Sequence, residues 1–444
     1  MLLPVTLLCG GQFLVVLDAT IVAVALPAIR HSLALSHDGL QWVVTAYALT
    51  FGGLLVATGR AGDLVGHRRL LQAGLVTFGG ASLACALAPS GAALIAGRAV
   101  QGAGAAMEAP AALALVATLP DRRRGVAWLT AAAAAGGASG WVLGGVLVEA
   151  FGWPAVFAVN VPLCAAGALL APRVLAERRG AARRLDVAGS TAVTAGLALL
   201  VLGLSEQPAA LPAAGAAFAA FAWIERRASD PILPGWTLRR PGFARANGVA
   251  LALTATTTPA MFLAILYQQE VLGRSALEAG LWCAPFNLAV IGGSLLGRPG
   301  AMAGGLAGVS AGTLALATLR PAALPVAFVL MGAGLGCASV ASTASGTAAL
   351  PDGEQGIASG VLNASAQIGS AVGVAVIVGL GYRAGFVVAA VVALTVAKAS
   401  KDRRERAAVH RPGGAGHVRR ALRAQEDDDG GDLVGLAEAA ERDA

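Results

Sequence analysis

The chain has 444 residues, of which 57% are hydrophobic and only 13% are charged, and its formal net charge is +7. A typical soluble domain carries about 25% charged residues, so this chain lacks the polar side chains needed to cover a water-facing surface of its size. Its arginines stand in short clusters between apolar segments rather than in one basic stripe, which argues against nucleic acid as a partner. The composition predicts an all-α polytopic membrane protein.

Apolar segments long enough to cross about 30 Å of hydrocarbon follow one another through most of the chain. The first lacks a basic region before it, so we expect it to be a retained helix rather than a cleaved signal peptide. Together the segments predict fourteen transmembrane helices. In chain order they lie near residues 4–29, 40–59, 70–89, 92–118, 126–149, 154–172, 185–204, 210–224, 244–268, 277–297, 301–319, 323–349, 356–379 and 382–398.

The loops between these segments differ in charge. Most loop arginines fall on one side, as in residues 122–124, whereas the other side holds few, such as Arg30 and Arg274. Because positively charged loops stay on the cytoplasmic side, we expect a multi-pass protein of the plasma (inner) membrane with its N-terminus inside. Residues 399–444 mix charge runs with glycine, which predicts a disordered cytoplasmic tail.

The pattern of glycines suggests a doubled architecture. Small residues at four-residue spacing let helices approach closely in lipid. If the seventh and eighth spans are an inserted pair, two glycine-rich helices take equivalent places in two six-helix halves, which is a plan that transporters use. The predicted domains are then 1–175, 176–240, 241–398 and the tail 399–444. The glycines are Gly136, Gly140 and Gly144 in the fifth span, and Gly356, Gly360, Gly369 and Gly373 in the thirteenth.

Three ionisable residues lie well inside predicted spans, where a charge costs about 2.5–3.5 kcal/mol. Asp18 is near the middle of the first span, and Arg98 and Glu108 are in the fourth. At 100° per residue Arg98, Gln101 and Glu108 share one helix face, and we place Glu108 and Asp18 at similar depths. We predict that Asp18 and Glu108 exchange protons with Arg98 as counter-ion, and that Asp18, Gln101 and Glu108 line a substrate cavity. A static ion pair that fixes helix packing is the alternative.

The loop after the second span reads GRAGDLVGHRRLL. Gly59 and Gly66 permit a tight turn, and Asp63 can cap the next helix or pair with arginine. Arg68 and Arg69 would anchor the loop at the anionic inner face of the membrane. From the residues alone, this is an ordinary basic inner loop.

Aromatic, histidine and cysteine residues carry no further site in this interpretation. Phe151, Trp153 and Phe157 are predicted to form part of an interfacial aromatic belt. The histidines and cysteines show no metal-ligand spacing, and no Ser/His/Asp grouping stands out. We therefore expect no catalytic residue, no metal, no cofactor and no enzyme activity.

Several stretches match a known pattern. LDATIVAVALPAI (17–29), the fourth-helix run Arg98, Gln101, Gly102 and Gly104, and the stretch GASGWVLGG that ends at Gly145 resemble motifs of the major facilitator superfamily, specifically of its fourteen-helix drug:proton antiporter branch. The loop signature of the superfamily is resembled by Gly59, Asp63, Gly66, Arg68 and Arg69. The stretch GIASGVLNASAQIGSAVG resembles the C-terminal half of the same branch. Ala23, Leu64 and Trp141 depart from the motifs.

The resemblance implies the major facilitator fold, with two six-helix bundles plus an inserted helix pair. It further implies alternating access, with export of lipophilic or cationic drugs or natural products driven by the proton gradient. In such proteins the arginine at Arg98 is associated with proton coupling, and the Asp63–Arg69 loop would latch the inner side. The expected partners are the lipid bilayer, a small-molecule substrate and protons, with a monomer as the working unit.

Three other functions stay open at this point. An uptake symporter would use the same fold, and the Trp141 departure in the antiporter motif leaves room for it. A non-transporting sensor or partner subunit would bind ligand without flux. A membrane-embedded enzyme would need a catalytic constellation.

Overall fold

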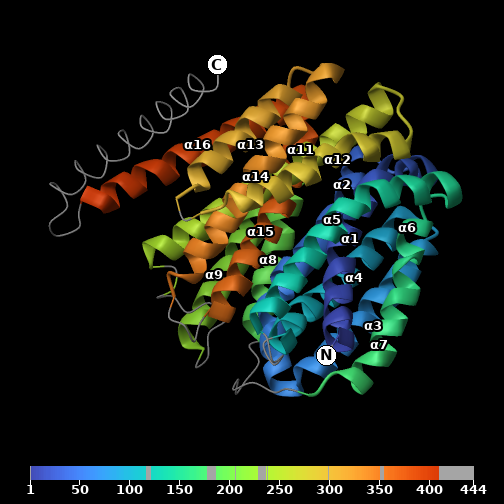
Figure 1. Cartoon of the computed structure of the whole chain (residues 1–444), viewed down its shortest axis with the longest axis vertical. Coiled ribbons are helices and arrows are strands. Elements are labelled where there is room, and N and C mark those ends of the chain that lie inside the picture. Colours follow the sequence, from blue (N-terminus) through green and yellow to red (C-terminus); the bar gives the residue numbers. More distant parts are fainter. Residues whose placement is uncertain are drawn as a thin grey trace, which may run out of the picture. The chain divides into compact units, whose positions relative to one another are not determined.

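The structure is a computed structural model that describes residues 2–116, 122–177, 187–205, 207–228, 237, 239–298, 300–350 and 355–409. Within these residues it consists of helices joined by short turns, with no strand (Figure 1). The first part of the chain forms α1 (Leu2–Leu33), α2 (His37–Val65), α3 (His67–Ala86), α4 (Gly91–Val116), α5 (Arg122–Phe151), α6 (Ala155–Ala158), α7 (Asn160–Val174), α8 (Val187–Ser205), η1 (Pro208–Ala210) and α9 (Leu211–Arg227).

The second part continues with helices of the same kind. They are α11 (Pro241–Leu266), η2 (Tyr267–Val271), α12 (Ala276–Leu295), α13 (Met302–Leu316), η3 (Pro321–Ala323), α14 (Leu324–Thr347), α15 (Gln355–Ile377), η5 (Val378–Leu380) and α16 (Tyr382–Val409).

A helix covers each of the segments that the sequence predicts to cross the membrane, so the all-α membrane architecture is confirmed. Ten helices of the described chain are long and apolar enough to cross, and the bent α2 makes an eleventh if its two parts form one span. The apolar helices α8 and α13 are shorter. The count of fourteen spans therefore stays a prediction.

The chain divides into two compact units after Val396. The contacts below belong to the first unit. The second unit begins with the end of α16, which continues as a helix to Val409. Helix therefore extends into the segment predicted as a disordered tail from residue 399, and residues 410–444 lie outside the described part of the chain.

The same pattern of helix packing occurs twice. In the first repeat α1 packs on α5, while α4 packs on both α2 and α3. In the second, α11 packs on α15, while α14 packs on both α12 and α13. The contacts between the repeats are also reciprocal, because α2 packs on α15 and α12 packs on α5. The helices thus form two related halves joined through equivalent pairs.

Glycines allow the tightest of these approaches. A Cβ on Gly140 of α5 would meet Thr20 Oγ1 on α1, and one on Gly136 would meet the carbonyl oxygen of Phe13. In the second repeat a Cβ on Gly369 or Gly373 of α15 would meet backbone of α11. Any side chain at these positions would push the paired helices apart, as expected for small-residue packing in lipid.

Not every glycine in the pattern serves this purpose. A Cβ on Gly360 of α15 would have no atom within 4 Å, so the spacing of Gly360 in the sequence does not mark a close contact. Its position explains this, because it faces away from α11 while Gly369 and Gly373 face toward it. Gly356 lies among residues whose side-chain surroundings the structure does not describe.

The predicted inserted pair corresponds to α8 and α9. These two helices pack against each other, and α8 also contacts α2 and α15. Since α2 belongs to the first repeat and α15 to the second, α8 lies against the seam between the repeats.

Candidate functional site

The first predicted site residue, Asp18 on α1, has no exposed surface. Its Oδ1 accepts hydrogen bonds from Gln101 Nε2 at 2.7 Å and from Asn160 Nδ2 at 2.9 Å. Its Oδ2 accepts a hydrogen bond from Arg98 Nη1 and forms an ion pair with that guanidinium. Both carboxylate oxygens therefore have partners from α4 or α7.

Arg98 is equally enclosed, with 2% of its side chain exposed. Its Nη1 also donates to Gln101 Oε1 at 2.6 Å, and its Nε donates to the Val43 carbonyl oxygen of α2 at 2.9 Å. The guanidinium carbon lies 4.4 Å from the ring centroid of Tyr47 and 5.9 Å from that of Phe157. A buried cation is tolerated when an ion pair, hydrogen bonds and aromatic faces replace its hydration.

The site draws on five neighbouring helical segments. Gln101 Nε2 donates to Ser82 Oγ of α3 at 2.9 Å, which adds α3 to α1, α2, α4 and the α6–α7 region. Close helix contacts hold this arrangement together. A Cβ on Gly102 would meet the Tyr47 carbonyl oxygen, so the glycine lets α4 approach α2 closely enough for Arg98 to reach Val43. We call Asp18, Ser82, Arg98, Gln101 and Asn160 the Asp18 network.

The structure brings Asp18, Arg98 and Gln101 together but places Glu108 elsewhere. A Cβ on Gly11 would lie 3.3 Å from Glu108 Oε2, so Glu108 is level with Gly11 on α1. Gly11 is seven positions before Asp18, which is about 10 Å along a helix. The expectation that Glu108 and Asp18 lie at similar depth is therefore wrong. The reason is that α1 and α4 run antiparallel, so Gln101 lies opposite Asp18 and Glu108 lies opposite Gly11.

Sequence reasoning missed four members or neighbours of the network. Ser82, Asn160 and Tyr47 are uncharged and look like ordinary membrane-helix residues. Phe157 was assigned to an interfacial belt, but it is fully buried against Arg98, and Trp153 is buried as well. The belt assignment is wrong for these two because α6 folds inward after Gly152, whose φ of 80° favours glycine. The signal in the sequence that could have identified Asn160 was its position in a segment flanked by prolines.

The predicted loop site lies at the junction of α2 and α3. Gly66 has a φ of 108°, a region that favours glycine. Glu177, which follows α7, accepts a hydrogen bond from the Arg68 backbone N–H at 3.0 Å. Its carboxylate also lies 3.5 Å from Arg68 Nε and 3.7 Å from Arg69 Nε. The sequence did not single out Glu177, which ties this junction to the end of α7.

Two other loop residues lie on α2. Asp63 Oδ1 is 3.0 Å from His67 Nε2, so Asp63 pairs with histidine rather than with arginine as one interpretation expected. The reason is local, since Asp63 lies in the last turn of α2 and His67 is the first residue of α3, so the turn at Gly66 brings the two side chains together. Gly59 faces α4, where a Cβ would lie 3.6 Å from Pro110.

The remaining predicted residues are on α5. Gly136 and Gly140 face α1 beside Asp18, and a Cβ on Gly144 would lie 3.0 Å from the Ile21 carbonyl oxygen. Gly145 faces the other way, because its Cβ would lie 2.5 Å from Leu277 Cα on α12. The glycine face of α5 thus packs on the segment of α1 that carries Asp18, and its back packs on the second repeat.

Comparison with known proteins places this arrangement in a family. Residues 8–374 match the Major Facilitator Superfamily. The chain belongs to the Major Facilitator Superfamily. It is accordingly a multi-span membrane transporter and not an enzyme.

Relatives within the superfamily include proteins named for antibiotic export or resistance. The chain is 35% identical to the puromycin resistance protein of Streptomyces alboniger, covering 82% of this chain and 78% of that one. It is 34% identical to the lincomycin resistance protein of Streptomyces lincolnensis, over 84% and 82%. It is 43% identical to the cephamycin export protein of Amycolatopsis lactamdurans over 64% of this chain, and the match spans 62% of that relative's length.

Solved structures share the fold at low identity. A human organic anion transporter superposes with a TM-score of 0.64 at 18% identity, covering 89% of this chain and 98% of that one. A POT-family transporter superposes with a TM-score of 0.68 at 12% identity, covering 92% and 99%. At these identities the likeness concerns the fold alone.

Proposed function

We propose that this superfamily member exports antibiotic-like small molecules across the plasma membrane in exchange for protons. The cargo class is supported by its relatives, which are named for cephamycin export and for resistance to puromycin and lincomycin. Both termini would lie in the cytoplasm, as the arginine-rich loops favour. A single chain holds the whole Asp18 network, which supports a monomer as the transport unit.

The observation that carries proton coupling is the fully buried ion pair of Asp18 and Arg98. Protonation of Asp18 would remove the negative charge while Arg98 keeps its positive charge. Breaking a buried pair in this way costs about 3–5 kcal/mol, because it leaves an uncompensated buried cation. A proton that reaches Asp18 would therefore destabilise the packing of α1 against α4 and α7 and favour another arrangement of the halves.

At one end of the helices, contacts join the two repeats, and such a rearrangement would have to break them. Arg30 at the end of α1 pairs with Glu270 of η2 at 2.8 Å, and Gln269 Nε2 donates to the Val24 carbonyl oxygen at 3.0 Å. Glu149 at the end of α5 accepts from the Leu277 backbone N–H at 3.0 Å. In the proposed orientation this end is external. The cycle would then run from this externally closed form to one in which these contacts break and protons enter.

The test compares driven transport with exchange in proteoliposomes that contain the purified full chain. Cephamycin, puromycin and lincomycin serve as labelled cargo, with and without an imposed pH gradient. Asp18→Asn should reduce the rate of gradient-driven transport at least tenfold. It should retain gradient-free exchange of labelled for unlabelled cargo. A purely structural role would reduce both activities together.

Glu278→Gln is the matched control. Glu278 is an exposed carboxylate that caps α12, and glutamine retains that capping role. It should leave both transport and exchange unchanged. Gradient-driven transport by Asp18→Asn at the wild-type rate would reject the proposed coupling, and no transport of any of the three compounds by wild type would reject the cargo class.

A further inference from the structure

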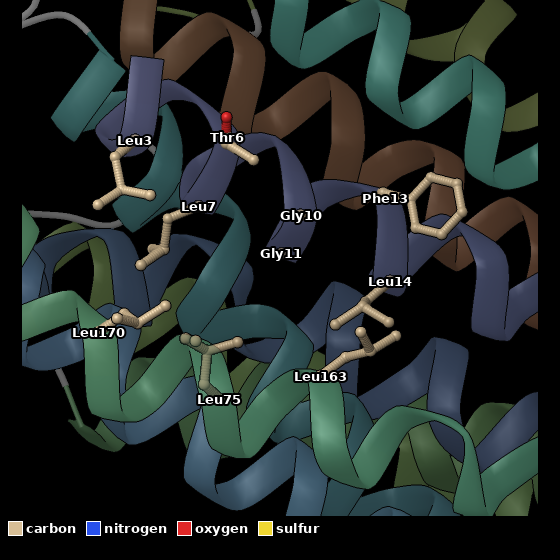
Figure 2. Close-up of a pocket in the computed structure, with 11 residues that line it drawn as sticks. Leu3, Thr6, Leu7, Gly10, Gly11, Phe13, Leu14, Leu75, Leu163 and Leu170 are labelled. Carbon is tan, nitrogen blue, oxygen red and sulfur yellow. The ribbon is translucent and has the colours of Figure 1, made fainter. Parts of the chain in front are cut away.

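An apolar crevice of about 260 Å³ lies between α1, α3 and α7. Leucine side chains of all three helices surround it (Figure 2). Leu3 on α1 is 55% exposed and Leu163 on α7 is 47% exposed, and α7 lies at the outer edge of the helices in Figure 1. In a bilayer the crevice therefore opens toward lipid.

Glycines make room for this crevice. Gly10 and Gly11 lie on α1 between Leu7 and Leu14, so this stretch of the helix presents no side chain to the space (Figure 2). A Cβ on Gly10 would have no atom within 4 Å. On the facing helix α7, Gly167 also lines the crevice. The space is therefore set by where the backbones lack side chains, and a side chain added at Gly10 would enter it.

The lining is suited to hydrocarbon rather than to water. Thr6 supplies its one side-chain hydroxyl, whereas a bound water needs two to four polar partners. An empty apolar space forfeits the dispersion contacts of the side chains around it. A hydrocarbon chain from the bilayer would restore these contacts and bury the leucines.

The length of the crevice matches one leaflet of a bilayer. Leu3 and Leu170 lie at one end, and Leu14 and Leu163 lie at the other (Figure 2). Leu3 and Leu14 are eleven positions apart on α1, which is about 16 Å along a helix. One leaflet contributes half of the hydrocarbon thickness, or roughly 15 Å. In the proposed orientation the Leu3 end is cytoplasmic, so an acyl chain in the crevice would belong to a lipid of the inner leaflet.

Positive charge gathers at the Leu3 end. Arg173 follows Leu170 by three positions on α7, so the two share a helix face, and the arginine is exposed. One of its N–H groups donates to a carbonyl oxygen of its own helix, and other guanidinium donors can bind a phosphate. Arg68 and Arg69 at the start of α3 share the carboxylate of Glu177. The arginines outnumber this carboxylate, which favours an anionic headgroup.

We propose that this crevice binds an anionic phospholipid of the inner leaflet, which lays one acyl chain between α1, α3 and α7 and places its phosphate against Arg173. The lipid is a bound partner and not cargo. Because it fills the space beside α1, it stabilises the packing of that helix on α3 and α7. The inference does not rest on the proposed export function.

The experiment measures lipid binding to the purified, delipidated full chain by native mass spectrometry. Dioleoyl phosphatidylglycerol is the anionic probe, and dioleoyl phosphatidylcholine carries the same acyl chains on a headgroup without net charge. The quantity compared is the dissociation constant of the first bound lipid. We expect wild type to bind phosphatidylglycerol at least fivefold more tightly than phosphatidylcholine.

One variant tests the acyl-chain part of the site. Gly10→Leu should fill the crevice without a clash at its Cβ, and it should weaken binding of the first molecule of either lipid at least fivefold. Gly80→Leu is the matched control. It lies on α3 outside the crevice lining, and a Cβ there also meets no atom within 4 Å, so it should bind both lipids like wild type.

A second variant tests the headgroup part. Arg173→Gln should lower the preference for phosphatidylglycerol to less than twofold and leave the affinity for phosphatidylcholine unchanged. Arg226→Gln is its control, because Arg226 also lies in the last turn of a helix, α9. This control should keep the wild-type preference.

Photolabelling of wild type locates the lipid independently of any variant. Phosphatidylglycerol with a diazirine on its acyl chain should label peptides of α1, α3 and α7. Labelling spread over lipid-exposed helices in general would overturn the proposal, even if Gly10→Leu fails to fold.

The binding data can also contradict the proposal. Equal first-lipid affinities of wild type and Gly10→Leu would overturn it. An equal loss of preference in Arg226→Gln and Arg173→Gln would overturn it as well, since that indicates general attraction to a basic surface. Displacement of phosphatidylglycerol by an equal concentration of oleate would assign the crevice to a fatty acid instead. None of these measurements involves transport, so failure of the export proposal would leave the lipid site untouched.

Discussion

Arg30 Nη1 lies 2.8 Å from Glu270 Oε1, which joins the end of α1 to η2 across 240 positions of the chain. Tyr382 at the start of α16 donates a hydrogen bond to the other oxygen of Glu270 at 3.1 Å. Both partners of the ion pair are about one quarter to one third exposed. The pair therefore links the two repeats where water can reach it, while the Asp18–Arg98 pair lies within the first repeat away from water.

The first prediction concerns this link between the repeats. Arg30→Gln should favour the form in which this end is open, because it removes the ion pair while Tyr382 still holds Glu270. Partly exposed pairs contribute about 0.2–1 kcal/mol, so the shift in populations should be several-fold at most. Spin labels at the ends of α1 and α12 would report it as a longer distance population in pulsed EPR.

A charge-swapped variant makes that experiment specific. Arg30→Glu combined with Glu270→Arg should restore the wild-type distance distribution, whereas Arg30→Glu alone should widen it further than Arg30→Gln. Arg320→Gln, an exposed change in the loop between α13 and α14 at the same end, should have no effect. Identical distributions in all variants would show that the pair does not hold this end closed.

The second prediction concerns the energetics of the Asp18–Arg98 pair. Asp18→Asn and Arg98→Gln each leave one buried charge without its partner, so each should lower the free energy of unfolding by about 3–5 kcal/mol. The double variant leaves no uncompensated charge and should be destabilised by less than the sum of the two. Denaturant unfolding in detergent would measure this double-mutant cycle. Additive losses would mean that the two groups do not stabilise each other.

The third prediction concerns the glycine face of α5. Gly140→Ala places a Cβ against Thr20 Oγ1 and within 2.9 Å of Thr20 Cβ. Such overpacking costs about 1–3 kcal/mol, so thermal unfolding should occur at a lower temperature. Gly360→Ala is the matched control on the equivalent helix of the second repeat, and it should be neutral or slightly stabilising because alanine favours helix. Equal melting temperatures for both variants would show that α1 and α5 can separate without cost.

The sequence predicted the membrane helices well because their determinant is local. A run of about 20 apolar residues is long enough to cross the hydrocarbon layer wherever it occurs in the chain, and each predicted segment does contain a helix. The same argument drew attention to Asp18 and Arg98, since an ionisable side chain inside such a run is costly and calls for a partner. Glycine spacing likewise indicated a close helix contact at Gly136 and Gly140, whereas the structure identified α1 as the partner.

Which side chains meet was decided only by the tertiary structure. Periodicity put Gln101 and Glu108 on one face of α4, but the antiparallel register of α1 opposite α4 gives Gln101 to Asp18 and leaves Glu108 beside Gly11. Asn160 and Ser82 join the network because α7 and α3 pack beside Asp18 and Gln101 at these residues. No local sequence pattern indicates which residues of packed helices lie opposite one another. Whether a segment forms a membrane helix depends on residues that are close together in the sequence. Its register against another helix depends on how the surfaces of both helices pack. Local sequence therefore determined where the helices form, whereas the tertiary structure determined which partners each buried charge has.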